Sequence, residues 1–191
     1  LIYERIVMRN HYFLGIVIFV FSTVFSANGF AKGDVRRGEA KYKVCAACHG
    51  ENGEGRKIAN APRISGQYSW YIARQLKNFR NNVRGTHIDD ITGMQMRPIA
   101  MTLGTDQDID DVVAYVGNLN GRGKHSGVKG DIKKGESAYA VCVTCHGANG
   151  QGNTVLNAPK IAGLPDWYIE RQLNNFKKGI RGVHPKDIFG Q

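Results

Sequence analysis

The sequence has no apolar run long enough to span a membrane. Its longest run covers residues 12–25, whereas a transmembrane helix needs about 20 apolar residues. The run follows the basic residues Arg5 and Arg9 and precedes small residues, a pattern typical of an export signal. We expect cleavage after Ala31, so that residues 1–31 are a signal peptide outside the fold. An uncleaved membrane anchor is the less favoured interpretation.

Cysteine is scarce, and the spacing of the four residues argues against a disulfide framework. An oxidising compartment would permit two bridges, but both pairs have the spacing C-x-x-C and are followed directly by histidine. Zinc would need all four cysteines together, and a redox dithiol belongs to a strand–helix context that is absent here. The pattern C-x-x-C-H predicts two covalently bound haem c groups, each with two thioether bonds and a histidine ligand to iron. The predicted haem-binding residues are Cys45, Cys48, His49, Cys142, Cys145 and His146.

The two motifs belong to an internal repeat with a constant offset of 97 residues. Asn-Ala-Pro at 60–62 recurs at 157–159, Trp-Tyr-Ile at 70–72 recurs at 167–169, and Arg-Gly at 84–85 recurs at 181–182. Because each copy carries its own cofactor motif, the repeat predicts two domains, at residues 32–120 and 131–191. The polar, glycine-rich segment 121–130 is the predicted linker.

Each copy is predicted to be helical. A first helix begins near Gly38 and runs into the first cysteine motif. A second is capped by Ser69 and has an apolar face that extends to Val83. A third opens at Thr105 with the capping-box pattern Thr-x-x-Asp, and it carries an apolar stripe that continues to Leu119 and is expected to be core.

Methionine, a common distal ligand of electron-transfer haems, occurs only four times. Three of the four, Met94, Met96 and Met101, lie in a Gly- and Pro-containing segment that we interpret as a loop before the third helix. The residues alone leave open which one binds iron, and the other two are expected to fill the core. No methionine follows His146, and by the repeat offset Gln191 corresponds to Met94. We therefore expect the second domain to be incomplete and its distal ligand to lie beyond Gln191.

These motifs, with the Ala-Pro-x-Ile-x-Gly segments at 61–66 and 158–163, resemble the tandem dihaem cytochromes c of the cytochrome c4 type over roughly residues 34–191. The resemblance implies an all-α fold of two tandem cytochrome c-like helical domains, the second truncated at its C-terminus. It assigns the distal ligand of the first haem to Met96, with Met94 and then Met101 as the next candidates. It also implies that the carbonyl groups of Pro62 and Pro159 accept hydrogen bonds from the proximal histidines.

Polar side chains near the motifs suggest further contacts. Candidates for haem propionate contacts are Trp70, Tyr71, Arg74 and Arg97, although the two aromatic residues could equally be packing residues. His87 and His184 occupy equivalent positions, and structural or surface roles are favoured over iron ligation. His125, in the linker, is expected to be solvated.

Acidic residues are few relative to basic ones, and the formal net charge is +10. Setting aside residues 1–31 removes two basic residues and one acidic residue, which leaves +9. The chain has no nucleic-acid-binding motif, so an acidic redox partner or a membrane surface is the expected contact of a basic surface. The surface charge therefore favours a protein that meets acidic partners.

The predicted function is that of a monomeric, periplasmic electron carrier and not an enzyme. It would shuttle electrons between a quinol-oxidising complex and a terminal oxidase or reductase, with membrane association possible. Alternatives are a dihaem enzyme such as a peroxidase with an open haem site, and a cytochrome subunit of a dehydrogenase. The similarity of the two copies argues against the peroxidase, because such an enzyme needs two unlike haem sites.

Overall fold

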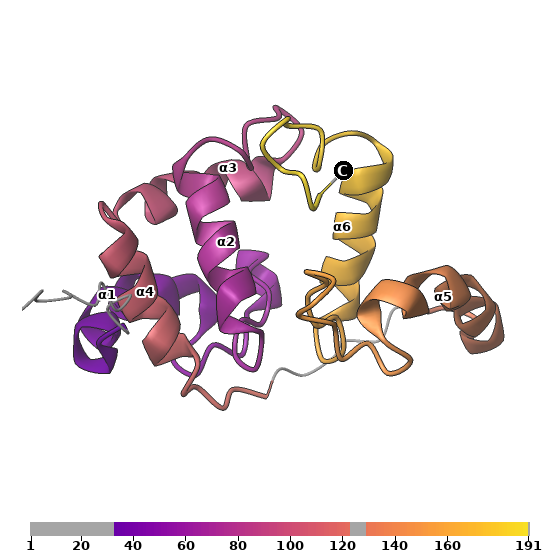
Figure 1. Ribbon diagram of the computed structural model, residues 1–191, viewed down its shortest axis with the longest axis horizontal. Helices are drawn as coiled ribbons and strands as arrows, with labels where there is room; N and C mark the ends of the chain where they lie inside the picture. The colour runs from indigo at the N-terminus through magenta and orange to yellow at the C-terminus, as the bar shows by residue number, and fades with distance from the viewer. Residues whose placement is uncertain (1–32, 123–128, 191) are drawn as a thin grey trace, which may run out of the picture.

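The computed structural model describes residues 33–122 and 129–190, and these are helical (Figure 1). The predicted signal peptide and His125 lie outside the described residues, as does most of the predicted linker. Within the described ranges there are six α-helices and one short 3-10 helix, with two isolated β-bridges and no strand. None of the helices in these ranges has the length and apolar character needed to cross a membrane.

The first unit contains four of the six helices. Its helices are α1 (Val35–His49), α2 (Ser69–Arg80), α3 (Ile91–Met101) and α4 (Asp106–Val116), with the 3-10 helix η1 (Lys57–Ala59) after α1. The side chain of Asp34 caps α1 by accepting a hydrogen bond from the backbone of Arg37 at 2.9 Å. The predicted capping box at the start of α4 is confirmed, with Thr105 and Asp108 bonding each other's backbone N–H groups.

Several predicted helix boundaries were wrong. Helix α1 begins three residues before Gly38, because Asp34 supplies the cap. Ser69 is the first residue inside α2 and makes no capping hydrogen bond, and Val83 is buried but lies beyond the end of that helix. The segment with the three methionines, expected as a loop, is helix α3. Pro98 lies inside this helix, where it removes one backbone hydrogen bond without ending the helix.

The core of the first unit lies between α1, α2 and α4. The apolar stripe of α4 is buried, with Ile109 and Val116 almost fully enclosed. A Cβ atom added at Gly38 of α1 would lie 2.0 Å from the backbone oxygen of Asp111, so the two helices approach at backbone distance. The buried carboxylate of Asp111 also accepts hydrogen bonds from Arg37 Nε at 2.7 Å and from the backbone N–H of Asp34 at 2.7 Å. Polar and apolar contacts therefore hold α1 on α4.

The second unit repeats the first two α-helices with the same offset of 97 residues. Helix α5 spans Ile132–His146 and helix α6 spans Asp166–Lys177, which correspond residue for residue to α1 and α2. Helix α5 has no counterpart of α4 beside it among the described residues, and none of its residues is buried. Val141 is 85% exposed, whereas Val44, its equivalent on α1, is 44% exposed. Figure 1 shows α5 extending away from the rest of the molecule.

The two units meet along α2 and α6, which Figure 1 shows facing each other. The contacts repeat in pairs: Arg74 donates to the carbonyl oxygen of Asn157 at 3.0 Å, and Arg171 donates to that of Asn60 at 2.9 Å. Gln67 adds a hydrogen bond to the carbonyl oxygen of Lys160 at 2.7 Å. The residue boundaries of the two domains stay a prediction, but these reciprocal contacts join the repeated helices into one interface.

Candidate functional site

Both C-x-x-C-H motifs occupy the last turn of a helix. His49 is the final residue of α1, and His146 is the final residue of α5. The glycine after each histidine, Gly50 or Gly147, has a positive φ of 85° or 79°, which an L-residue rarely adopts, and it turns the chain back towards the histidine. Helix geometry therefore places both thiols and the imidazole of each motif around one helix end.

The proximal histidines are held in the same way in both units. The Nδ1 atom of His49 lies 2.8 Å from the carbonyl oxygen of Pro62, and that of His146 lies 2.8 Å from the carbonyl oxygen of Pro159. The predicted contacts of both prolines are therefore present. A carbonyl only accepts, so Nδ1 carries the proton in this arrangement and Nε2 keeps its lone pair for a metal.

Burial keeps the imidazole of His49 neutral. The desolvation of this buried side chain lowers its pKa, and the hydrogen bond to Pro62 only partly opposes that effect. Neutral imidazole is the form that binds iron. The charge state and the tautomer of His49 both suit it to ligation through Nε2.

The four motif cysteines are free thiols in the structure. Burial raises the pKa of Cys45 to about 11. A catalytic dithiol needs a depressed pKa, because the thiolate is the reactive form. The raised value at Cys45 therefore argues against a thiol–disulfide oxidoreductase.

A cavity of about 460 Å³ lies between the motifs and is lined by both units. Its lining includes Cys45, Cys48 and His49 of the first unit, and Cys142 and His146 of the second. Most of the lining is apolar, as expected for a site that encloses a large flat ligand. The interface between the units and the two motifs therefore form one connected site.

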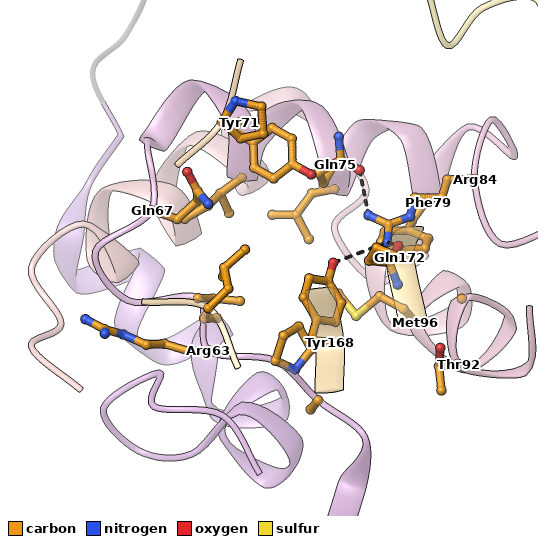
Figure 2. Close-up of a pocket in the computed structure, with 18 of the residues that line it drawn as sticks. Arg63, Gln67, Tyr71, Gln75, Phe79, Arg84, Thr92, Met96, Tyr168 and Gln172 are labelled. Carbon is orange, nitrogen blue, oxygen red and sulfur yellow. Dashed lines mark hydrogen bonds between the residues drawn. The ribbon is translucent and has the colours of Figure 1, made fainter. Parts of the chain in front are cut away.

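Of the three candidate methionines, Met96 is the one that lines the cavity (Figure 2). It is partly buried and packs against the core of the first unit. Met94 and Met101 are 42% and 53% exposed and do not line the cavity, so they do not fill the core as expected. The position of α3 thus distinguishes Met96 from the other two candidate ligands, whereas the spacing of the three methionines in the sequence does not.

Three of the four residues predicted to contact propionates have protein hydrogen-bond partners in the structure. Arg74 is bonded across the interface, Tyr71 accepts a hydrogen bond from Arg181 at 3.0 Å, and Arg97 donates to Asn82 at 2.6 Å. The indole N–H of Trp70 is buried and has no hydrogen-bond partner. Their contacts with a propionate stay a prediction.

The two histidines outside the motifs that the structure describes, His87 and His184, are engaged locally. The Nδ1 atom of His87 accepts from the backbone N–H of Asp89 at 3.1 Å, and that of His184 accepts from Lys186 at 3.1 Å. Neither histidine lines the cavity. These contacts agree with the structural role favoured for both residues.

Sequence reasoning missed two buried arginines in the cavity. Arg84 and Arg181 occupy equivalent repeat positions, and each is 8% exposed. The signal was the recurrence of Arg-Gly at an offset of 97, which by itself indicates no particular role. Only the folded chain shows that the two side chains reach the same place.

The residues present fit haem c. The paired thiols, the neutral imidazole of His49 with Nδ1 engaged, and the apolar cavity are what covalent attachment and iron ligation require. The buried Nε–H groups of Arg84 and Arg181, two residues of the cavity lining, have no partner and are further donors open to a polar group. Cys45 with Cys48, and Cys142 with Cys145, would hold the two groups.

Comparisons with known proteins agree with this site. The cytochrome c family model matches residues 35–120 and 132–187, one segment in each unit. A cytochrome c4 of Pseudomonas aeruginosa is 32% identical, over 79% of this chain and 75% of that protein. A thiosulfate dehydrogenase electron acceptor of Stutzerimonas stutzeri is 31% identical, over 77% of this chain and 69% of that protein.

A solved structure of reduced recombinant cytochrome c4 from Pseudomonas stutzeri is also similar. It has a TM-score of 0.60 and 30% sequence identity, and the match covers 77% of this chain and 82% of that one. The predicted all-α tandem fold and the two covalently bound haem c groups are thereby confirmed. The chain belongs to the cytochrome c family, as a cytochrome c4-like dihaem electron carrier.

Proposed function

We propose that this electron carrier binds the iron of its first haem between His49 and Met96, and that of its second haem on His146. The observation that carries the assignment is that Met96, unlike Met94 and Met101, faces the cavity that His49 lines. A thioether opposite an imidazole gives a closed, high-potential site. Haem c supplies reversible one-electron chemistry, and the chain's own residues position it and exclude water.

We place the protein in the periplasm, between a quinol-oxidising complex and a terminal oxidase or reductase. No bond is made or broken in such a transfer, so we assign no catalytic residue. The basic net charge supports acidic redox partners, since complementary charge steers encounters through small, short-lived interfaces.

The first unit is the better candidate for docking a partner. Arg56 donates a hydrogen bond to the carbonyl oxygen of Ala47, between the two motif cysteines, so its charge lies beside the haem attachment. The equivalent residue of the second unit is the neutral Asn153. Ile58, two positions further along the chain, is almost fully exposed and offers an apolar contact. An acidic partner would thus meet charge and an apolar surface together at this edge.

Stopped-flow reduction by a purified quinol-oxidising complex tests the proposal. The rate should fall as salt rises, because the Debye length is only about 8 Å at physiological ionic strength. Arg56→Gln should slow reduction at low salt more than Arg36→Gln, which removes the same charge from an exposed position on α1. A rate independent of salt, or equal effects of the two variants, would exclude steering at this edge.

A second candidate function is acceptance of electrons from a dehydrogenase. The similarity to a thiosulfate dehydrogenase electron acceptor favours this function over that of a dihaem peroxidase. Mixing the oxidised protein with thiosulfate dehydrogenase and thiosulfate should then reduce both haems faster than the quinol-oxidising complex does. If the dehydrogenase gives the slower reduction, the respiratory shuttle is retained.

Turnover of peroxide distinguishes a carrier from an enzyme. Peroxidase chemistry needs an open sixth position and acid–base groups beside it. We expect no sustained consumption of hydrogen peroxide by the reduced protein. Catalytic turnover that persists in Met96→Ala and is lost in a second-unit variant would assign an open enzymatic site to His146 instead.

A further inference from the structure

Two buried cations, Arg84 and Arg181, meet where the two units join. Each is 8% exposed, each lines the cavity, and their positions are related by the repeat offset. Figure 2 shows Arg84 beside Phe79 and Met96 at one end of the cavity. Arginine stays protonated in proteins, so two positive charges are enclosed beside the cofactor site.

Arg84 binds side chains of both units. Its Nη1 atom donates to Gln75 Oε1 at 2.6 Å within the first unit. Its Nη2 atom donates to Gln172 Oε1 at 3.0 Å and contacts the hydroxyl of Tyr168 at 3.4 Å, both in the second unit (Figure 2). The side chain of Arg84 therefore crosses the interface.

Arg181 makes the reciprocal contacts. Its Nη1 atom donates to Gln172 Oε1 at 2.6 Å within the second unit. Its Nη2 atom donates to the hydroxyl of Tyr71 at 3.0 Å and to Gln75 Oε1 at 3.2 Å, both in the first unit. Each glutamine thus receives hydrogen bonds from both arginines, and the four side chains form one cluster.

No carboxylate in the part of the chain that the structure describes bonds the cluster directly, although the buried carboxylate of Asp187, which also lines the cavity, attracts Arg181 from beyond ion-pair distance. Among the described residues, no carboxylate forms an ion pair with either guanidinium. The Nε–H groups of Arg84 and Arg181 are buried and have no hydrogen-bond partner. Each guanidinium stacks 4.6 Å from the ring of a phenylalanine, Phe79 or Phe176, which compensates only part of the cost of burying a charge.

The phenol of Tyr168 responds to this excess charge. Burial by itself raises the pKa of a tyrosine, but the positive charges of Arg84 and Arg181 outweigh burial and lower the pKa of Tyr168. The two guanidinium groups therefore stabilise a negative charge at this position. The cluster is complementary to anions, with two guanidinium groups of the fork shape that binds carboxylates.

We propose that Arg84 and Arg181 form one carboxylate-binding site, shared between the units, that holds acid side chains of both haems. The two guanidinium groups face the cavity that both cysteine motifs line, and each has an N–H donor to spare. Because each arginine also bonds the other unit's glutamine, the site makes each haem sensitive to substitutions in the other unit. The site depends on haem attachment and not on which redox partner delivers the electron.

Reduction potentials of the two haems, resolved by spectroelectrochemical titration, test the shared site. A buried positive charge favours the reduced, less positive iron, so Arg84→Gln should lower both potentials, and Arg181→Gln should lower both as well. The control Arg36→Gln removes an equal charge from the exposed surface of α1 and should leave both potentials close to those of the parent protein. Resonance Raman bands of haem propionate bending should shift in the two cluster variants and not in the control.

Further measurements keep the proposal open to refutation. Haem content and circular dichroism establish that each variant is folded. Arg84→Lys, which keeps the charge, should lower the haem potentials less than Arg84→Gln does. Potentials that change only in the mutated unit would overturn the sharing. Potentials and Raman bands no different from those of the Arg36→Gln control would overturn the site. A shift of the haem potentials on adding acetate to the parent protein would also overturn it, because the cluster would then bind an anion from solution.

Discussion

Replacing Gly38 with alanine tests how closely α1 packs on α4. The added Cβ atom would lie 2.0 Å from the backbone oxygen of Asp111, 2.6 Å from its carbonyl carbon and 2.9 Å from Cβ of Tyr115. Two of these neighbours are backbone atoms and cannot rotate away. The helices must therefore separate, and such overpacking costs about 1–3 kcal/mol.

The repeat supplies a matched control at Gly135. It occupies the position on α5 equivalent to Gly38 on α1, and a Cβ atom there would meet nothing within 4 Å. In a helix interior, alanine is more stable than glycine by about 0.5–1 kcal/mol. The same gain offsets part of the cost at Gly38, which leaves a net loss of up to about 2.5 kcal/mol there. The two substitutions should thus change the stability of their units in opposite directions: Gly38→Ala should lower it and Gly135→Ala should raise it.

Hydrogen exchange measured by mass spectrometry separates the two effects, because peptides from α1 and α5 report on each unit by itself. Gly38→Ala should speed exchange in α1 and α4, and Gly135→Ala should slow exchange in α5. Equal protection changes in the two variants would refute the close approach of α1 to α4, as would a stabilised α1 in Gly38→Ala.

Three further predictions concern the haem sites and the core. A pyridine haemochrome assay should find two covalently bound haems per chain, and haem that extracts with acidified acetone would contradict attachment through the cysteines. Met96→Ala should abolish the weak long-wavelength iron–thioether band of the oxidised protein and lower the potential of the first haem. Replacing the exposed Met101 with alanine should change neither. A band lost only in Met94→Ala would assign the distal ligand to Met94 instead. Asp111→Asn should destabilise the first unit by about 1–3 kcal/mol at neutral pH, because the charged hydrogen bonds from Arg37 are weakened. Arg37 holds the pKa of Asp111 well below its usual range. The stabilisation from the ionised carboxylate should therefore be complete above the ordinary aspartate pKa of about 3.9 and should be lost progressively as pH falls below it. Urea unfolding should show a smaller difference in free energy of unfolding between parent and variant at pH 3 than at pH 7.

Local signals in the sequence were sufficient for much of the fold. The capping box at Thr105 and the apolar stripe of α4 were predicted correctly, because both depend on residues within a few positions of each other. The start of α1 and the role of Ser69 were missed, because any of several polar residues near a helix end can serve as a cap. The methionine segment was mistaken for a loop because its glycine and proline disfavour helix, whereas a cap from Asp90 and packing on α2 stabilise α3.

The sequence by itself determined the chemistry of attachment and the presence of two related units. Two C-x-x-C-H motifs at a constant offset specify thioether bonds and a proximal ligand through residues adjacent in the chain, so no tertiary information was needed. The tertiary structure alone decided which methionine lines the same cavity as His49, and that Arg84 and Arg181 bond the same two glutamines. Those outcomes depend on how helices rotate and approach one another. The contacts of the two arginines across the interface join residues 84 to 110 positions apart, which no local pattern records.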